Sequence, residues 1–160
     1  MHLKGSCHCG DVRFSVESNH PYPFNLCYCS ICRKTAGSGG YAINISASFE
    51  TLKIDGEKNI RKYSAKVVDA ETGKSVASPA ERSFCGNCGS ALWSWDPRWP
   101  ELLHPQASAI DTDLPKPPER THLMLSSKLE WVQPCISDDD QTFDEYPSES
   151  IAAWHERLRL

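Results

Sequence analysis

Cysteine is the residue type whose number and spacing in this sequence could support chemistry. The chain has eight cysteines. Cysteines two or three positions apart are typical of metal ligands, whereas a disulfide scaffold commonly joins distant cysteines in an exported protein. The local spacing therefore indicates metal binding rather than four disulfides. Seven of the cysteines form three clusters, which are Cys7 with Cys9, Cys27 with Cys29 and Cys32, and Cys85 with Cys88.

The first and third clusters together predict one structural zinc site. Residues i and i+2 of an extended segment point to the same side, so Cys7 and Cys9 can offer two sulfurs to one ion. Cys85 and Cys88 have the spacing of a zinc knuckle, with Gly89 directly after them. Two pairs make the closed four-cysteine set of a structural zinc. The alternative is that either pair consists of buried thiols without a metal, since free cysteine packs as a small hydrophobe.

The middle cluster has three sulfurs and no evident fourth ligand. Cys27 and Cys29 face one way in an extended segment, and a turn after them can bring Cys32 to the same ion. Three protein ligands and one open position are the pattern of a catalytic zinc. A fourth ligand from Cys135, from a histidine or from an acidic residue would make the site structural instead. We favour the open site and expect Cys135 to be a lone packed thiol.

A zinc ion with three thiolates is a weak Lewis acid, so a thiol suits the open position better than water does. Coordination ionises a thiol whose ordinary pKa is about 8.5. A thiolate in the open position adds a negative charge to the site, which nearby cations would stabilise. Arg33 and Lys34 follow Cys32 directly. Glycine lets the backbone approach a ligand closely. We therefore expect catalysis by Cys27, Cys29, Cys32 and Arg33, and ligand binding by Lys34, Gly37, Gly39 and Gly40.

Length and charge narrow the function classes. A chain of 160 residues is the size of a single domain. Its 17 basic and 21 acidic residues give a net charge of −4, which argues against general nucleic-acid binding. No apolar run is long enough for a membrane helix. The first residues lack the apolar stretch of a secretory signal, so we expect a cytoplasmic location.

The elements that must position these residues are mainly β-strands. Alternation of apolar and polar residues predicts strands, whereas an apolar face at helical spacing predicts a helix from about 149 to 159, with Ser148 as its N-cap. A short helix is expected at 30–35. Residues 95–118 hold many prolines and are expected to form an irregular loop. Asp138 to Asp140 are expected to form a solvated acidic turn. The expected strands are 11–17, 41–45, 49–54, 60–63, 90–95, and 121–131 with an interruption at Ser126.

The order of these motifs resembles the glutathione-dependent formaldehyde-activating enzyme (GFA) family, which includes centromere protein V. The resemblance covers about residues 1–135 and includes all seven clustered cysteines. It is carried by the segments 5–10, 27–34 with Gly37, 84–91 and 122–131.

The resemblance implies a zinc-containing β-tent fold like that of methionine sulfoxide reductase B, in one domain over 1–160. It implies a structural zinc at Cys7, Cys9, Cys85 and Cys88, and a second, glutathione-responsive zinc at the middle cluster. The family's named reaction condenses glutathione with formaldehyde and is classed as carbon–sulfur lyase chemistry. The chain departs from the family at Tyr28, where histidine is more usual, in an insertion-like segment at 67–80 and in a Trp- and Pro-rich loop at 93–105.

We therefore expect a zinc-dependent, glutathione-using carbon–sulfur lyase or transferase. Its expected partners are a small-molecule thiol and an electrophile, with a homodimer as one form of assembly. The alternative is a non-catalytic, zinc-stabilised scaffold or thiol carrier. A sulfoxide reductase would need a redox cysteine free of metal, and only Cys135 is available for that role.

Overall fold

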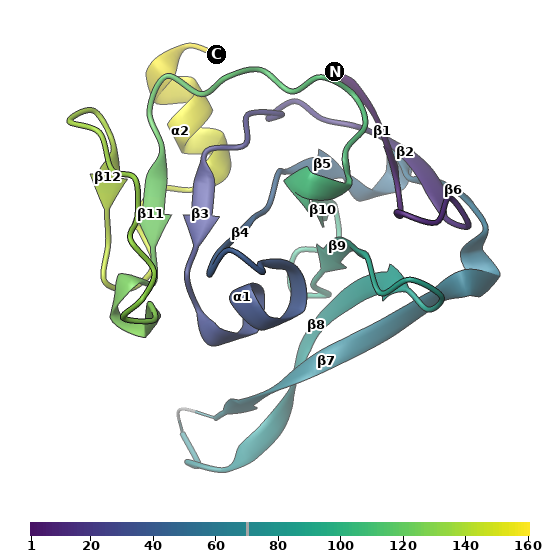
Figure 1. Ribbon diagram of the computed structural model, residues 1–160, viewed down its shortest axis with the longest axis horizontal. Coiled ribbons are helices and arrows are strands. Elements are labelled where there is room, and N and C mark those ends of the chain that lie inside the picture. Colours follow the sequence, from purple (N-terminus) through teal and green to yellow (C-terminus); the bar gives the residue numbers. More distant parts are fainter. Residues whose placement is uncertain (70) are drawn as a thin grey trace.

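The fold of the computed structural model is mainly β, as expected, and the structure describes residues 1–69 and 71–160. Three sheets surround a short central helix, and a second helix lies near the C-terminus (Figure 1). The two predicted helices are confirmed as α1 (Ser30–Ala36) and α2 (Ile151–Leu158). Ser150, rather than Ser148, is the N-cap of α2, because its side chain accepts a hydrogen bond from the Ala153 amide.

The first sheet is antiparallel and confirms the strand expected at 11–17. The strand expected at 49–54 is wrong in its first half, which forms the 3-10 helix η1 (Phe49–Thr51). The Thr51 hydroxyl donates to the Ser48 carbonyl at 2.7 Å and so supports a turn there instead of an extended chain. The strands of this sheet are, in spatial order, β1 (His2–Ser6), β2 (Arg13–Glu17) and β6 (Lys53–Asp55).

The second sheet is also antiparallel and ends in a long hairpin that projects from the body of the protein (Figure 1). The insertion-like segment 67–80 forms the outer part of this hairpin, and residue 70 within it lies outside the described residues. The strands are, in spatial order, β5 (Ala47–Ser48), β10 (Leu102–Pro105), β9 (Ala91–Trp95), β8 (Ser75–Cys85) and β7 (Ile60–Val68), with the 3-10 helix η2 (Glu57–Asn59) just before β7.

Residues 95–118 are not the irregular loop that their prolines predicted, because they contain β10 and the 3-10 helix η3 (Ala107–Ala109). Strand β10 pairs with β9 on one side and with β5 on the other. Pro105 of β10 has no amide hydrogen to donate, but its carbonyl accepts a hydrogen bond from the Ile45 amide at 2.9 Å. The sheet therefore extends through a proline that lacks a donor of its own.

The third sheet holds the strand that leads into the middle cysteine cluster. Its central strands β3 and β11 are parallel to each other, although they are far apart in the chain. The strand expected at 121–131 is shorter than predicted, because Met124 adopts a left-handed backbone (φ 62°) and the 3-10 helix η4 (Leu125–Ser127) follows. The strands are, in spatial order, β12 (Gln141–Thr142), β11 (Thr121–Leu123), β3 (Asn25–Cys27) and β4 (Ala42–Ile43).

The main core lies where the first and second sheets pack together. Phe14 of β2 meets Trp93 of β9 edge to face, with ring centroids 5.0 Å apart. Cys7 and Cys85 belong to the same buried cluster, so one cysteine from each pair of the expected structural zinc site sits in the core. Further members are Leu3, Val12, Val16, Ala47, Leu92, Leu103 and Ala109.

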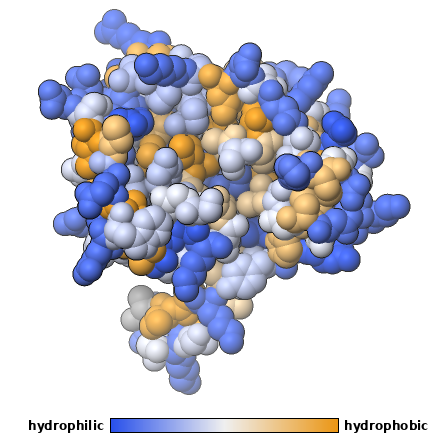
Figure 2. All heavy atoms as spheres, in the orientation of Figure 1, coloured by the Kyte–Doolittle hydropathy of each residue, from blue (hydrophilic) through white to orange (hydrophobic). Residues whose placement is uncertain are grey.

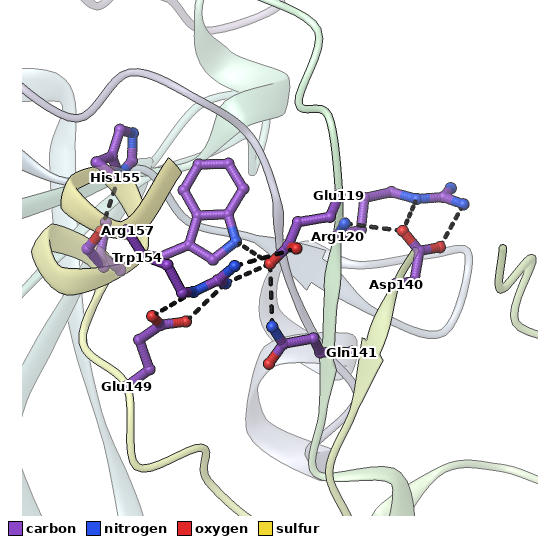
Figure 3. Close-up of polar contacts among 9 residues, drawn as sticks. Glu119, Arg120, Asp140, Gln141, Glu149, Trp154, His155 and Arg157 are labelled. Carbon is purple, nitrogen blue, oxygen red and sulfur yellow. Dashed lines mark hydrogen bonds and ion pairs between the residues drawn. The ribbon is translucent and has the colours of Figure 1, made fainter. Parts of the chain in front are cut away.

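Helix α2 is fastened to the third sheet by stacking and by a polar cluster (Figure 3). Trp154 is 1% exposed and stacks on Phe24, with centroids 3.7 Å apart and an interplanar angle of 7°. Its indole nitrogen donates to Glu119 Oε1 at 2.9 Å, and Arg157 pairs with both Glu119 and Glu149. The predicted apolar face is thus confirmed as core packing at Trp154 and His155.

Replacing Trp154 with alanine should destabilise the protein by about 3–5 kcal/mol, because a fully buried aromatic side chain is lost and a cavity is left against Phe24. Urea unfolding measures this change. Trp131→Ala is the matched control, since Trp131 is 66% exposed and its loss should change stability by no more than about 0.5 kcal/mol. Equal effects of the two substitutions would contradict the assigned role of α2.

No helix in the described part of the chain is both long enough and apolar enough to cross a membrane.

Candidate metal centres and the cleft beside them

Cys7, Cys9, Cys85 and Cys88 converge on one point, as expected. Their four sulfurs lie within 4.8 Å of one another. The Cys7 and Cys9 sulfurs are 3.5 Å apart, and those of Cys9 and Cys85 are 3.7 Å apart. Tetrahedral zinc with Zn–S bonds of about 2.3 Å places its sulfurs about 3.8 Å apart. The donor set and its spacing therefore fit a tetrahedral zinc.

Local hydrogen bonds also favour the thiolate at two members of this cluster, Cys7 and Cys88. The Val12 amide donates to the Cys7 sulfur at 3.3 Å. At the knuckle, the positive φ of Gly89 (75°) lets its amide return to the Cys85 carbonyl. Hydrogen bonds from the Ser90 hydroxyl and amide lower the pKa of Cys88 to about 5. A sulfur that loses its proton readily is prepared to bind a metal ion.

The sulfurs of Cys27, Cys29 and Cys32 form a second group, again within 4.8 Å of one another. Cys27 ends β3, Cys29 is the N-cap of α1, and Cys32 lies in the first turn of that helix. The Cys32 amide donates to the Cys29 sulfur at 3.4 Å. Hydrogen bonds from the Cys27 and Cys32 side chains, followed by those from the backbone, lower the pKa of Cys29 to about 2. The three donors thus fit a thiophilic ion such as zinc.

Within residues 1–69 and 71–160, no fourth histidine, cysteine, aspartate or glutamate joins this second group. Cys135 is exposed, so the expectation that it is packed is wrong. Its carbonyl accepts a hydrogen bond from Arg120. His122 is fully buried, but its Nδ1 lies 2.9 Å from the Tyr28 hydroxyl instead of facing the sulfurs. The described chain therefore leaves one coordination position free of protein ligands.

A buried polar chain holds the strand that carries two of these cysteines. Tyr28 lies between Cys27 and Cys29 and is 1% exposed. Its hydroxyl meets His122, whose Nε2 is 3.5 Å from Asp140, and Arg120 pairs with that carboxylate (Figure 3). The Arg120 guanidinium and several hydrogen bonds outweigh burial, so the pKa of Asp140 is held well below its usual range.

The expectation of a solvated acidic turn at 138–140 is thus wrong at Asp140, whose side chain is only 2% exposed. Sequence reasoning missed this chain because Tyr28, His122 and Asp140 come from three separate segments. The parallel pairing of β3 with β11, and of β11 with β12, brings these segments side by side.

A cavity of about 660 Å³ lies between the later turns of α1 and the zinc knuckle, at Gly89 and Ser90. Arg33, Lys34 and Gly37 line it, as a ligand-binding role would require. The Nε atom of Arg33 is buried without a hydrogen-bond partner in the described chain. The positive charges of Arg33 and Lys34 favour an anionic ligand in this cavity.

The three glycines expected at the ligand differ in their surroundings. Gly37 lines the cavity, and a Cβ there would collide with the Tyr41 carbonyl. Gly40 has a positive φ of 95° and packs against Val132, whereas Gly39 has no neighbour within 4 Å of a Cβ position. Gly37 is thus the member of this run that lines the cavity, and ligand binding by Gly39 and Gly40 stays a prediction.

Two residues that sequence reasoning missed lie near the sulfurs of the second cluster. Desolvation of its hydroxyl raises the pKa of Tyr146, although the residue as a whole is 71% exposed, and charge on the three cysteine sulfurs raises it further, against the opposing charge of Arg82. Hydrogen bonding to Cys27 and the charge of Arg82 lower the pKa of Cys32, but hydrogen bonding to Cys29, burial and the charge of Cys29 outweigh them and raise it. Arg82 belongs to β8, about fifty positions from the cluster, so only the tertiary structure places this cation there.

The sequence pattern of the family described as glutathione-dependent formaldehyde-activating enzyme matches residues 2–126. A protein of Halomonas elongata is 59% identical over 160 residues, which span 100% of this chain and 98% of that protein, and its provisional name is glutathione-dependent formaldehyde-activating enzyme. The crystal structure of a Rhodobacter sphaeroides protein is similar at 28% identity with a TM-score of 0.52, over 70% of this chain and 91% of that chain.

Proposed function

The chain belongs to the glutathione-dependent formaldehyde-activating enzyme family, and from this premise we propose that it is a zinc-dependent, glutathione-using carbon–sulfur lyase or transferase. The electrophile is a small molecule such as an aldehyde. The observation that carries the proposal is the group formed by Cys27, Cys29 and Cys32, which has no fourth protein ligand in the described chain. A cytoplasmic location and assembly as a homodimer stay predictions.

The second cluster would hold the zinc at which thiol chemistry takes place, and the first cluster would hold a structural zinc. A zinc ion bound by Cys27, Cys29 and Cys32 would supply an acidic position that ionises the thiol of glutathione. Arg33 and Lys34 offset the negative charge and bind the carboxylates of the tripeptide in the adjoining cavity. Arg82 adds a third cation on the side of β8.

The proposed reaction needs no oxidant or reductant. The glutathione sulfur forms a bond with the carbonyl carbon, and the π electrons of the carbonyl pass to its oxygen. That oxygen takes up a proton equivalent to the one that the thiol released. The reverse sequence breaks the carbon–sulfur bond. The chain contributes by holding sulfur and carbonyl carbon together and by favouring the ionised thiol.

Glutathione binding should release close to one proton per chain at pH 7, because a thiol with an ordinary pKa of about 8.5 is then mostly protonated when free. Titration calorimetry in buffers of different ionisation enthalpy measures this number. The zinc-loaded protein and S-methylglutathione form the matched control, since the thioether has no proton to lose. Equal proton release by both ligands, or none by either, would overturn the proposed ionisation of the thiol.

A further inference from the structure

A second cavity, of about 330 Å³, adjoins the first one and shares lining residues with it. Its walls are mostly apolar, and Tyr63, Phe84 and Trp93 provide three aromatic side chains. Among the described residues that line it, Arg82 is the one that carries a charge. Apolar walls with a few polar groups, at a volume above about 300 Å³, are typical of small-molecule sites. Figure 2 shows hydrophobic residues among hydrophilic ones on the face that carries α1.

The two cavities adjoin each other between α1, which carries Cys32, and the segment that follows the zinc knuckle. Thr35 and Ala36 line both of them, and so do Gly89 and Ala91 on the opposite wall. Thr35 and Ala36 follow Cys32 by three and four positions on α1, so these side chains share one face of the helix.

The two cavities differ in chemistry. The first is polar and is lined by Arg33 and Lys34 and by one acid, Asp111, so it suits a ligand such as glutathione, which carries carboxylates and an amino group. The second has aromatic walls and suits an apolar group. Formaldehyde is little larger than water, whose share of liquid volume is about 30 Å³, and would leave most of the second cavity without contacts.

We propose that the second cavity binds the organic group of an aldehyde larger than formaldehyde, with an aromatic or branched apolar substituent. The inference rests on the proposed function, because glutathione must occupy the first cavity for its sulfur to reach the carbonyl carbon. The bond changes are those given above, with the hydrogen substituent of formaldehyde replaced by the apolar group. Phe84, Tyr63 and Trp93 then determine specificity.

Titration calorimetry of the zinc-loaded protein with glutathione, S-methylglutathione and S-benzylglutathione tests the proposal. The benzyl group takes the place of the aldehyde substituent, and no turnover is required. We expect S-benzylglutathione to bind at least about tenfold more tightly than S-methylglutathione, which is the size of effect that apolar pockets show for added hydrocarbon groups. The ratio of kcat/KM for benzaldehyde to that for formaldehyde should exceed one.

Substitutions in the second cavity should reduce these two ratios. Phe84→Ala should lower the benzyl-to-methyl affinity ratio by about tenfold, and Tyr63→Ala by about threefold. Tyr63 is 46% exposed, so its variant remains informative if Phe84→Ala fails to fold. Phe49→Ala is the matched control, because Phe49 is a half-exposed aromatic residue that lines a different cavity. It should leave the ratio unchanged.

The outcomes separate this proposal from the one on which it rests. If glutathione binds but its S-benzyl and S-methyl derivatives bind equally, the second cavity has no role and the proposed function survives. If Phe49→Ala lowers the ratio as much as Phe84→Ala does, the benzyl group lies elsewhere and the proposal is overturned. If glutathione itself fails to bind the zinc-loaded protein, both proposals fall together.

Discussion

Cys29→Ser should abolish thiol-dependent activity and lower the zinc content by one ion per chain while the protein stays folded. Cys29 is the central member of the second cluster, and a serine hydroxyl is a poor replacement for a thiolate ligand of zinc. The fold should survive because serine is among the preferred N-cap residues, and Cys29 occupies the N-cap of α1. The substitution therefore removes the ligand and keeps the start of the helix.

Zinc analysis of the purified variant, thermal unfolding and a glutathione titration measure these effects together. Cys135→Ser is the matched control, since Cys135 is an exposed cysteine outside both clusters. It should keep full activity and the zinc content of the unmodified chain. If Cys29→Ser unfolds as severely as Cys85→Ser, the second cluster is structural and the proposed catalysis is lost.

Cys85→Ser should prevent stable folding. Cys85 is fully buried, ends β8 and shares its site with Cys7 and Cys9 from the first part of the chain. Structural zinc contributes about 10–16 kcal/mol to folding in small zinc-binding peptides. The whole stability of a domain is about 5–15 kcal/mol. Loss of this site therefore removes a contribution as large as the total.

Soluble expression, circular dichroism and zinc content measure this second effect. A strong chelator applied to the unmodified chain should unfold it as well, which separates loss of metal from any packing effect of serine. A variant that folds normally with one zinc fewer would show that the first cluster is dispensable for the fold. An unfolded Cys135→Ser control would instead indicate that thiol loss in general is harmful.

Much of the local structure follows from short-range patterns in the sequence. The alternation in 11–17 predicted β2, the apolar face at 151–158 predicted α2, and the spacing within each of the three cysteine clusters predicted sulfurs that converge. Such features depend on residues within a few positions of one another, so no knowledge of distant segments is needed. The metal-ligand spacing is the clearest case, because the turn geometry of each pair is local.

Strand pairing and side-chain contacts between distant segments determined two features that the local patterns did not predict: strand β10 and the burial of Asp140. Prolines predicted a loop at 95–118, yet β10 forms there because β9 and β5 supply its partners. Asp140 is buried because Arg120 and His122 meet it from a neighbouring strand.

The sequence by itself determined a mainly β chain and three cysteine clusters with the spacing of metal ligands, since that spacing is a local property. Only the tertiary structure decided that the first and third clusters come together, that no fourth ligand in the described residues joins the middle cluster, and that a polar and an apolar cavity adjoin each other beside α1. These features depend on the register of strands far apart in the chain, which no local pattern encodes.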